Sequence, residues 1–277
     1  NNIFGIDIDQ DSVDHTKFLL NLLLVSLGYD KDFIKLNIIL ADSLESNWMK
    51  EFNLSSKFDY IIGNPPYIKI QSLNKDYLSH LSSIYSTMRS GSVNIFYAFI
   101  EMAEKMVSSQ GAICFILPNN FLKIKSAKHL RAFLYDHNLI SCLIDFGCNM
   151  IFNPIMTYNC ILIMNTKQKD HFHYAFVEET QNIESAMKNI SVLDLPQTIL
   201  QSDSWVFHDE RTRMKTQQAE QFDIKLGEFI RTGIATLRDK LYMVQKENNQ
   251  FIKYFDDQIF TIEAEVVKPI YKVSEIT

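Results

Sequence analysis

The sequence predicts an α/β fold built on a mostly parallel sheet, followed by the start of a second, β-rich domain. Two observations lead to this prediction. Short apolar segments alternate with helical segments along the first 180 residues, and these apolar segments are continuous rather than alternating. Continuous apolar strands are typical of parallel sheets with both faces covered. The last strands of the series follow one another without a helix, which predicts a hairpin at the end of the sheet.

Each element follows from the local spacing of apolar residues. Continuous apolar segments predict strands at residues 2–8, 35–41, 58–62, 111–117, 139–145, 158–164 and 171–177. Apolar residues at helical spacing predict helices at residues 11–27, 92–107 and 126–135.

The pattern loosens after residue 178. Residues 181–222 are polar, with a helical stretch at 209–221, and are predicted to be a connector. Short strands at 240–244, 251–254 and 258–262 then predict a β-rich module. The sequence therefore predicts a first domain at 1–180, a connector at 181–222 and the start of a second domain at 223–277.

Composition and charge exclude several classes of protein. Hydrophobic residues make up 47% of the 277 residues and charged residues 22%, which excludes a disordered chain. The net charge of −6 argues against a protein that coats nucleic acid by charge alone. The eight glycines never lie closer than six positions apart, so a complete dinucleotide-binding fingerprint or P-loop is excluded within these residues.

Neither a membrane segment nor a metal site is predicted. The longest apolar run, residues 18–27, is interrupted by Asn21 and Ser26 and is far shorter than the roughly 20 residues of a bilayer span. The chain does not open on a leader-like segment, and its four cysteines form no CxxC pair. We therefore expect a cytoplasmic protein without a membrane partner, a disulfide framework or a zinc site.

The sharpest chemical signal is the tetrapeptide Asn64-Pro65-Pro66-Tyr67, directly after the predicted strand at 58–62. Ligands of open α/β sheets bind beyond the carboxyl ends of strands, so this loop lies where chemistry is expected. The prolines remove two N–H donors and leave the Asn64 side-chain oxygen and the Pro65 carbonyl as acceptors. An adenine amine suits these acceptors because it offers two N–H groups, and Tyr67 can stack on the base. A structural proline turn with a surface tyrosine is the alternative.

The tetrapeptide resembles the signature of amino-methyltransferases that use S-adenosylmethionine, in particular adenine-specific DNA methyltransferases of the gamma type. Further segments resemble other motifs of this family, at residues 5–9, 40–43, 94–99 and 150–154. The resemblance implies a Rossmann-like methyltransferase sheet, S-adenosylmethionine as the cofactor, and Asn64, Pro65, Pro66 and Tyr67 as the catalytic residues.

The resemblance also assigns roles to four more residues. Asp7 matches the acidic residue that accepts the ribose hydroxyls of the cofactor, and Asp9 or Asp11 is better placed to cap the following helix. Asp42 matches the acceptor of the cofactor's adenine amine. Phe99 matches an aromatic residue that packs against the cofactor, and Phe152 one that stacks, with the tyrosine of the tetrapeptide, on the flipped target base. A plain turn for Asp42 and core positions for Phe99 and Phe152 are the structural alternatives.

Residues 226–240 and 262–269 resemble the opening of a target recognition domain, which follows the catalytic domain in Type IIG restriction–modification enzymes. The resemblance implies that residues 1–180 form the catalytic domain and that duplex DNA is the partner, and it leaves open whether a nuclease domain or subunit belongs to the full-length protein. Basic residues that could face DNA form two groups: Lys123, Lys125, Lys128, His129 and Arg131, and then Arg231, Arg238 and Lys240.

The sequence departs from the family in one respect. The family's first motif, a glycine-rich turn after a central first strand, would lie upstream of Asn2. Without that strand the sheet would have a gap and unpaired strand edges. We therefore expect a segment of a longer protein that is inactive alone.

Three functions remain open from the sequence. The first is methyl transfer to the exocyclic amine of adenine in duplex DNA, within a restriction–modification or related anti-phage protein. The second is methyl transfer to a glutamine of a protein or to ribosomal RNA, since the same tetrapeptide occurs in those enzymes. The third is a DNA-recognition segment whose methyltransferase half is catalytically degenerate.

Overall fold

The computed structural model describes residues 2–29, 36–69, 72–89, 93–149, 151–152, 157–177, 182–201, 204–207, 244–247, 250–255 and 258–267. The chain divides into two compact units, Asn1–Glu210 and Arg211–Thr277. Among the described helices, none combines the length and the apolar character that a membrane span requires.

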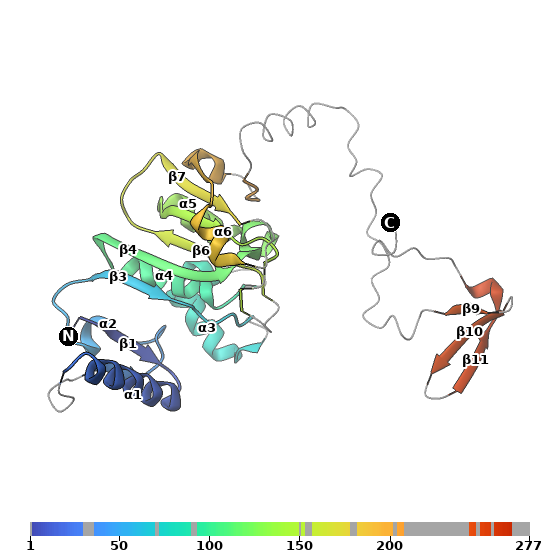
Figure 1. Cartoon of the computed structure of the whole chain (residues 1–277), viewed down its shortest axis with the longest axis horizontal. Helices are drawn as coiled ribbons and strands as arrows, with labels where there is room; N and C mark the ends of the chain where they lie inside the picture. The colour runs from blue at the N-terminus through green and yellow to red at the C-terminus, as the bar shows by residue number, and fades with distance from the viewer. Residues whose placement is uncertain are drawn as a thin grey trace. The chain divides into compact units, whose positions relative to one another are not determined.

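The first unit is built on two sheets (Figure 1). Two parallel strands, β1 (Phe4–Asp7) and β2 (Asn37–Leu40), pair with each other. A six-stranded sheet has the order β3-β4-β6-β5-β7-β8. Its strands are β3 (Phe58–Gly63), β4 (Val107–Pro118), β5 (Ile140–Asp145), β6 (Asn159–Met164), β7 (His171–Phe176) and β8 (Val192–Pro196).

Helices connect these strands. The α-helices are α1 (Gln10–Ser26), α2 (Trp48–Glu51), α3 (Lys75–Ile84), α4 (Phe96–Met106), α5 (Lys128–Asp136) and α6 (Ile183–Lys188). Short 3-10 turns are η3 (Ser86–Met88), η4 (Asn119–Leu122), η5 (Lys125–Ala127) and η6 (Gln197–Gln201). The predicted strands and helices of residues 2–177 are therefore confirmed within a few residues, and α2, α3, α6 and β8 are additional.

Four strands of the larger sheet run in one direction. β3 is parallel to β4, and β5 is parallel to β7. β6 is antiparallel to both β4 and β5, so these two share a direction as well. The predicted hairpin exists as the β5–β6 pair, but it lies inside the sheet rather than at its end, because β6 inserts between β4 and β5.

The core lies between one face of the large sheet and helices α3, α4 and α5. Alternate residues of the central strands point into it, as expected for a pleated sheet. The fully buried members include Leu81, Ile100 and Leu134 from the helices and Ile113, Leu117 and Leu162 from the sheet.

The opposite face of β3 is open. Tyr60 is 79% exposed and Ile62 is 80% exposed, so helices of the described residues cover only one face of this strand, and not both as predicted. Within the described part of the chain, no strand pairs with the outer edge of β3, and β1 pairs only with β2. Among the described residues, the two sheets of the first unit are therefore not joined by strand pairing.

The region predicted to be a connector contributes to the first unit. β8 pairs with β7, and Trp205 is buried, with its backbone N–H donating to the Leu122 carbonyl at 2.7 Å. The predicted boundary at residue 180 therefore lies too early. The region after residue 180 has few apolar residues, such as Leu195 and Leu200, and they are spread among polar ones. Because an edge strand such as β8 needs only one buried face, it was not recognised from this pattern.

The second unit contains an antiparallel sheet of order β11-β10-β9. Its elements are β9 (Gln245–Glu247), β10 (Gln250–Phe255), β11 (Gln258–Ile262) and the 3-10 turn η8 (Ala264–Val266). The predicted strands at 251–254 and 258–262 are confirmed. The helical stretch predicted at 209–221 lies outside the described residues, as does most of the strand predicted at 240–244.

Candidate active site

The strands that carry the predicted site residues share a direction. Phe4, at the start of β1, packs on Phe58, at the start of β3, with ring centroids 5.6 Å apart. At the other end, Asp42 beyond β2 accepts a hydrogen bond from Tyr77, in the helix that follows β3. The carboxyl ends of β1, β2 and β3 therefore meet at one edge, where ligands of open α/β sheets bind.

The tetrapeptide begins immediately beyond β3. Asn64 is exposed, and within the described part of the chain its amide forms no hydrogen bond. Pro65 is buried and Pro66 is exposed. A buried proline beside an exposed amide anchors the backbone while it leaves the Asn64 oxygen available to a ligand.

Tyr67 is fixed by its hydroxyl. The half-buried side chain donates to the Ile116 carbonyl at 3.2 Å, one residue beyond the last β3–β4 pair, Gly63 with Phe115. The hydroxyl thus donates to a backbone carbonyl of β4 just beyond the point where β3 ends. Burial raises the pKa of Tyr67 to about 12, so the hydroxyl keeps its proton and remains a donor at neutral pH.

The segment after the tetrapeptide is tied to the start of α4. The Ile95 N–H donates to the Ile68 carbonyl at 2.9 Å, and Lys69 forms an antiparallel bridge with Asn94. The rings of Tyr67 and Phe96 meet edge to face with centroids 6.5 Å apart. These contacts hold the loop at the tyrosine ring and at the two residues that follow it.

Asp7 and Asp9 have separate roles. Asp9 caps α1 by accepting hydrogen bonds from the Ser12 hydroxyl at 2.7 Å and the Ser12 N–H at 2.9 Å, which confirms the predicted cap. These bonds, the hydroxyl first, lower the pKa of Asp9. Asp7 is exposed at the end of β1, and its Oδ1 accepts from the Asp9 N–H at 2.9 Å. An exposed carboxylate at this position suits the two hydroxyls of a ribose.

Asp42 is half-buried and accepts two hydrogen bonds. The Leu44 N–H donates to its Oδ1 at 2.8 Å, and the Tyr77 hydroxyl donates to its Oδ2 at 2.7 Å. Tyr77 was not among the predicted site residues because no helix was predicted between residues 62 and 92. The available signal was Asn74, which caps α3, followed by apolar residues at helical spacing.

The two remaining aromatic residues lie on separate elements. Phe99, in the first turn of α4, is half-buried and packs against the main core, which is the alternative position; its contact with the cofactor stays a prediction. Phe152 is half-buried in the loop between β5 and β6, and its neighbours at 153–156 lie outside the described residues.

The ends of the loop that carries Phe152 are firmly held. Asp145, at the end of β5, is 7% exposed, and its Oδ1 accepts from the Gly147 N–H at 2.9 Å and the Asn119 side chain at 2.8 Å. The Asn119 N–H donates to the Tyr158 carbonyl at 3.0 Å. The loop thus starts and ends near the carboxyl end of β4, at the edge where Asn64 follows β3.

One residue of the predicted basic surface is a structural residue. Arg131 is buried, and its guanidinium donates to the carbonyls of Phe121 and Ile124. Burial prevents Arg131 from facing DNA, which corrects that part of the prediction. Lys123, Lys125, Lys128 and His129 are exposed. The second group, Arg231, Arg238 and Lys240, lies outside the described residues.

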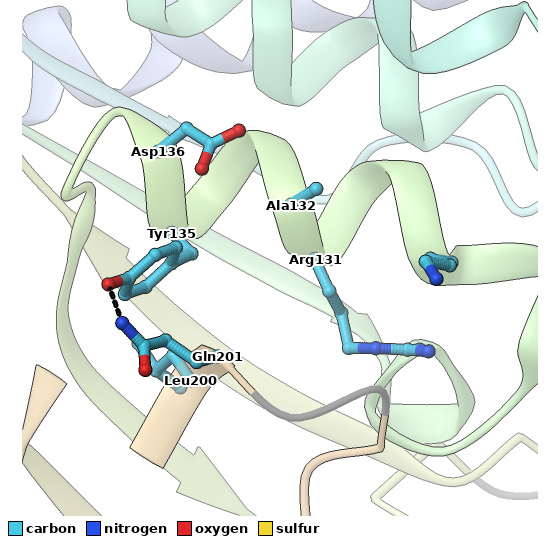
Figure 2. Close-up of a pocket in the computed structure, with 7 residues that line it drawn as sticks. Arg131, Ala132, Tyr135, Asp136, Leu200 and Gln201 are labelled. Atoms are coloured by element: carbon cyan, nitrogen blue, oxygen red, sulfur yellow. Dashed lines mark hydrogen bonds between the residues drawn. The ribbon is translucent and has the colours of Figure 1, made fainter. Parts of the chain in front are cut away.

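A pocket of about 210 Å³ lies beside Arg131, between α5 and η6 (Figure 2). Figure 2 shows the hydrogen bond of 2.6 Å from Gln201 to the Tyr135 hydroxyl in its wall. Gln197, at the start of η6, donates to the carbonyl of Ile140, the first residue of β5. The pocket is therefore next to the amino end of β5, at the opposite edge from Asn64.

A family model described as Eco57I restriction-modification methylase matches residues 1–152. The Type II restriction enzyme and methyltransferase RM.Eco57I of Escherichia coli is 27% identical over 98% of this chain and 30% of its own length. The Type II methyltransferase M.BstVI of Geobacillus stearothermophilus is 23% identical over 100% of this chain and 52% of its own length. The chain thus spans about a third to a half of these relatives.

Solved structures share the fold. The type IIG restriction endonuclease BpuSI superposes with a TM-score of 0.55 at 14% identity, covering 72% of this chain and 25% of that chain. A nuclease-deletion mutant of the Type ISP restriction-modification enzyme LlaGI, in complex with a DNA substrate mimic, gives a TM-score of 0.56 at 15% identity, covering 76% and 25%. The predicted fold class, an α/β methyltransferase sheet, is confirmed.

Proposed function

Because the chain belongs to the Eco57I restriction-modification methylase family, we propose that it carries the catalytic residues of a DNA methyltransferase acting on the exocyclic amine of adenine. The observation that carries this proposal is the exposed Asn64 amide at the carboxyl end of β3, held by a buried Pro65 and an anchored Tyr67. A rigid pair of acceptors in this position suits an amine with two N–H groups.

The reaction forms one bond and breaks one. The amine nitrogen of adenine attacks the methyl carbon, the carbon–sulfur bond breaks with its electron pair remaining on sulfur, and the amine loses one proton to solvent. S-adenosylmethionine supplies an electrophilic methyl group, so a strong general base is not required. The Asn64 oxygen and the Pro65 carbonyl each accept one N–H of the amine, which frees its lone pair. Positioning and exclusion of water then supply most of the rate.

Two carboxylates are proposed to hold the cofactor. The exposed Asp7 accepts the ribose hydroxyls, and Asp42 accepts the adenine amine of the cofactor. The two carboxylates lie at the ends of neighbouring parallel strands. Asp7 is the last residue of β1 and pairs with Leu40, the last residue of β2, two residues before Asp42. Phe99 offers an apolar contact in the first turn of α4.

We propose that the target adenine leaves the DNA double helix and stacks between the side chains of Tyr67 and Phe152. Flipping costs a few kcal/mol, and stacking on an aromatic ring returns about 1–3 kcal/mol per base. Because its hydroxyl is bonded to Ile116, the Tyr67 ring presents itself in a fixed orientation.

Partners of the whole protein are proposed from its relatives. We propose that residues 1–180, extended to Glu210 by β8 and Trp205, form the catalytic domain. The connector then lies within the rest of 181–222, and 223–277 begin a target recognition domain that contacts duplex DNA. RM.Eco57I is a restriction enzyme as well as a methyltransferase, which supports a nuclease domain or subunit in the same cytoplasmic system.

Methyl transfer from tritium-labelled S-adenosylmethionine tests the proposal. The full-length protein that contains this chain is purified and offered duplex DNA, ribosomal RNA and translation factors in parallel, and labelled DNA is digested to nucleosides. We expect label in DNA only, as N6-methyladenine. Label in protein or RNA would support methyl transfer to a protein glutamine or to ribosomal RNA, and it would contradict the proposed methyl transfer to DNA. Sequence-specific DNA binding without transfer to any acceptor would support a degenerate recognition segment.

A further inference from the structure

The carboxylate of Asp42 is held by donors from two parts of the chain. Its Oδ1 accepts from the Leu44 N–H two residues later, at 2.8 Å, which forms a local Asx turn. Its Oδ2 accepts from the Tyr77 hydroxyl, 35 residues along the chain, at 2.7 Å. One donor on each oxygen fixes the direction of the carboxylate. A carboxylate oxygen has two lone pairs and can accept a second hydrogen bond, so each oxygen of Asp42 retains capacity for a ligand.

Helix α3 places Tyr77 rigidly. Asn74 caps the helix by accepting from the Asp76 N–H at 2.8 Å, and Leu81 is fully buried in the core. Tyr77 therefore stands in the first turn of an anchored helix that follows the catalytic tetrapeptide. Burial, and then the hydrogen bond to Asp42, raise the pKa of Tyr77 well above its usual value, so its hydroxyl donates throughout the neutral range.

From this geometry we infer that Tyr77 is a positioning residue, which holds Asp42 in the orientation that recognises the adenine ring of the cofactor. The inference rests on the proposed function, in which Asp42 accepts the cofactor's amine. With the hydroxyl present, the acceptor is oriented before the cofactor arrives. Without it, Asp42 loses one of two restraints and must be ordered during binding, which weakens affinity.

The chain provides a matched control. Tyr85, directly after α3, donates its hydroxyl to the Leu44 carbonyl at 2.7 Å. It thus anchors the same turn through the same chemical group, but it bonds a backbone carbonyl instead of the carboxylate. Tyr85→Phe removes a structural hydrogen bond from the turn, whereas Tyr77→Phe removes the bond to the recognition group.

The test measures cofactor affinity by calorimetry with the full-length wild-type protein and with its Tyr77→Phe and Tyr85→Phe variants. Each is titrated with S-adenosylhomocysteine and with an analogue whose purine carries hydrogen in place of the amine. We expect the wild type to prefer the amine-bearing ligand, and Tyr77→Phe to reduce that preference by about five- to twentyfold, because the less restrained carboxylate keeps only part of its hydrogen bond to the amine. Tyr85→Phe should keep the preference, whatever its thermal stability.

Steady-state methylation gives an independent readout. Tyr77→Phe should raise the KM for S-adenosylmethionine and leave kcat within about twofold, because the reacting atoms lie at Asn64. The inference is overturned when the wild type prefers the amine-bearing ligand and Tyr77→Phe retains the same preference, or when Tyr85→Phe reduces it equally. A wild type that binds both ligands alike would instead contradict the role of Asp42 in the proposed function, and the inference with it.

Discussion

Substituting Tyr67 separates the anchoring role of its hydroxyl from the stacking role of its ring. Tyr67→Phe removes one hydrogen bond of 3.2 Å to the Ile116 carbonyl, which costs about 0.5–1.5 kcal/mol of folding free energy. The ring and its contact with Phe96 remain, so we expect kcat/KM for methylation of duplex DNA to fall by less than about fivefold. Urea denaturation measures the first quantity and single-turnover methylation the second.

Tyr67→Ala removes the ring as well. The target base then loses a stacking partner worth about 1–3 kcal/mol, which corresponds to a further loss of about 5- to 150-fold in kcat/KM. A duplex with a mismatched target lowers the cost of flipping for all variants alike and serves as the control substrate. Equal losses in Tyr67→Phe and Tyr67→Ala would refute the stacking argument, since the hydroxyl alone would then account for the effect.

Three further predictions concern buried polar groups. Glu101→Ala should lower the free energy of unfolding, measured by urea titration, by about 3 kcal/mol or more, because its buried carboxylate accepts hydrogen bonds from the Thr87 N–H and the Ser86 hydroxyl at 3.0 Å. The control is Glu104→Ala, which should lower it by less than about 1 kcal/mol, because its partner His137 is half-exposed. Arg131→Met should destabilise the fold by about 2–4 kcal/mol, since it leaves two carbonyls without their donor, and equal stability of this variant and the wild type would contradict the structural role. Folding stability should fall as the pH rises from 10 through 12, because buried phenols keep protons in the folded chain that the unfolded chain releases near pH 10; a flat stability curve above pH 10 would be inconsistent with this. The phenols whose pKa burial raises to about 12 are Tyr67, Tyr85 and Tyr97.

The sequence predicted the parts of the site that follow from strand ends. Asp7 and Asn64 directly follow strong apolar strands, and the cap at Asp9 follows from its position before a helix. Parallel strands then bring their carboxyl ends to one edge without any further information. Local signals of this kind therefore predicted the position of the tetrapeptide beyond β3, whereas the role of Asp7 was implied by the resemblance to the methyltransferase family.

Non-local features could not be predicted in this way. The place of β6 between β4 and β5 depends on pairing between distant segments, and no local pattern encodes it. Tyr77 was missed because its hydrogen bond to Asp42 joins segments that lie 35 residues apart in the sequence. Arg131 was misassigned because a run of basic residues does not reveal which member turns inward to carbonyl groups.

Substituting Asn64 by alanine tests the central claim most directly. The side chain is exposed and forms no hydrogen bond within the described residues, so Asn64→Ala should leave unfolding by urea unchanged. We predict that single-turnover methyl transfer to adenine in duplex DNA falls by about 100-fold or more, while the dissociation constant for S-adenosylmethionine stays within about twofold of the wild type. A variant that methylates adenine at the wild-type rate would contradict the account.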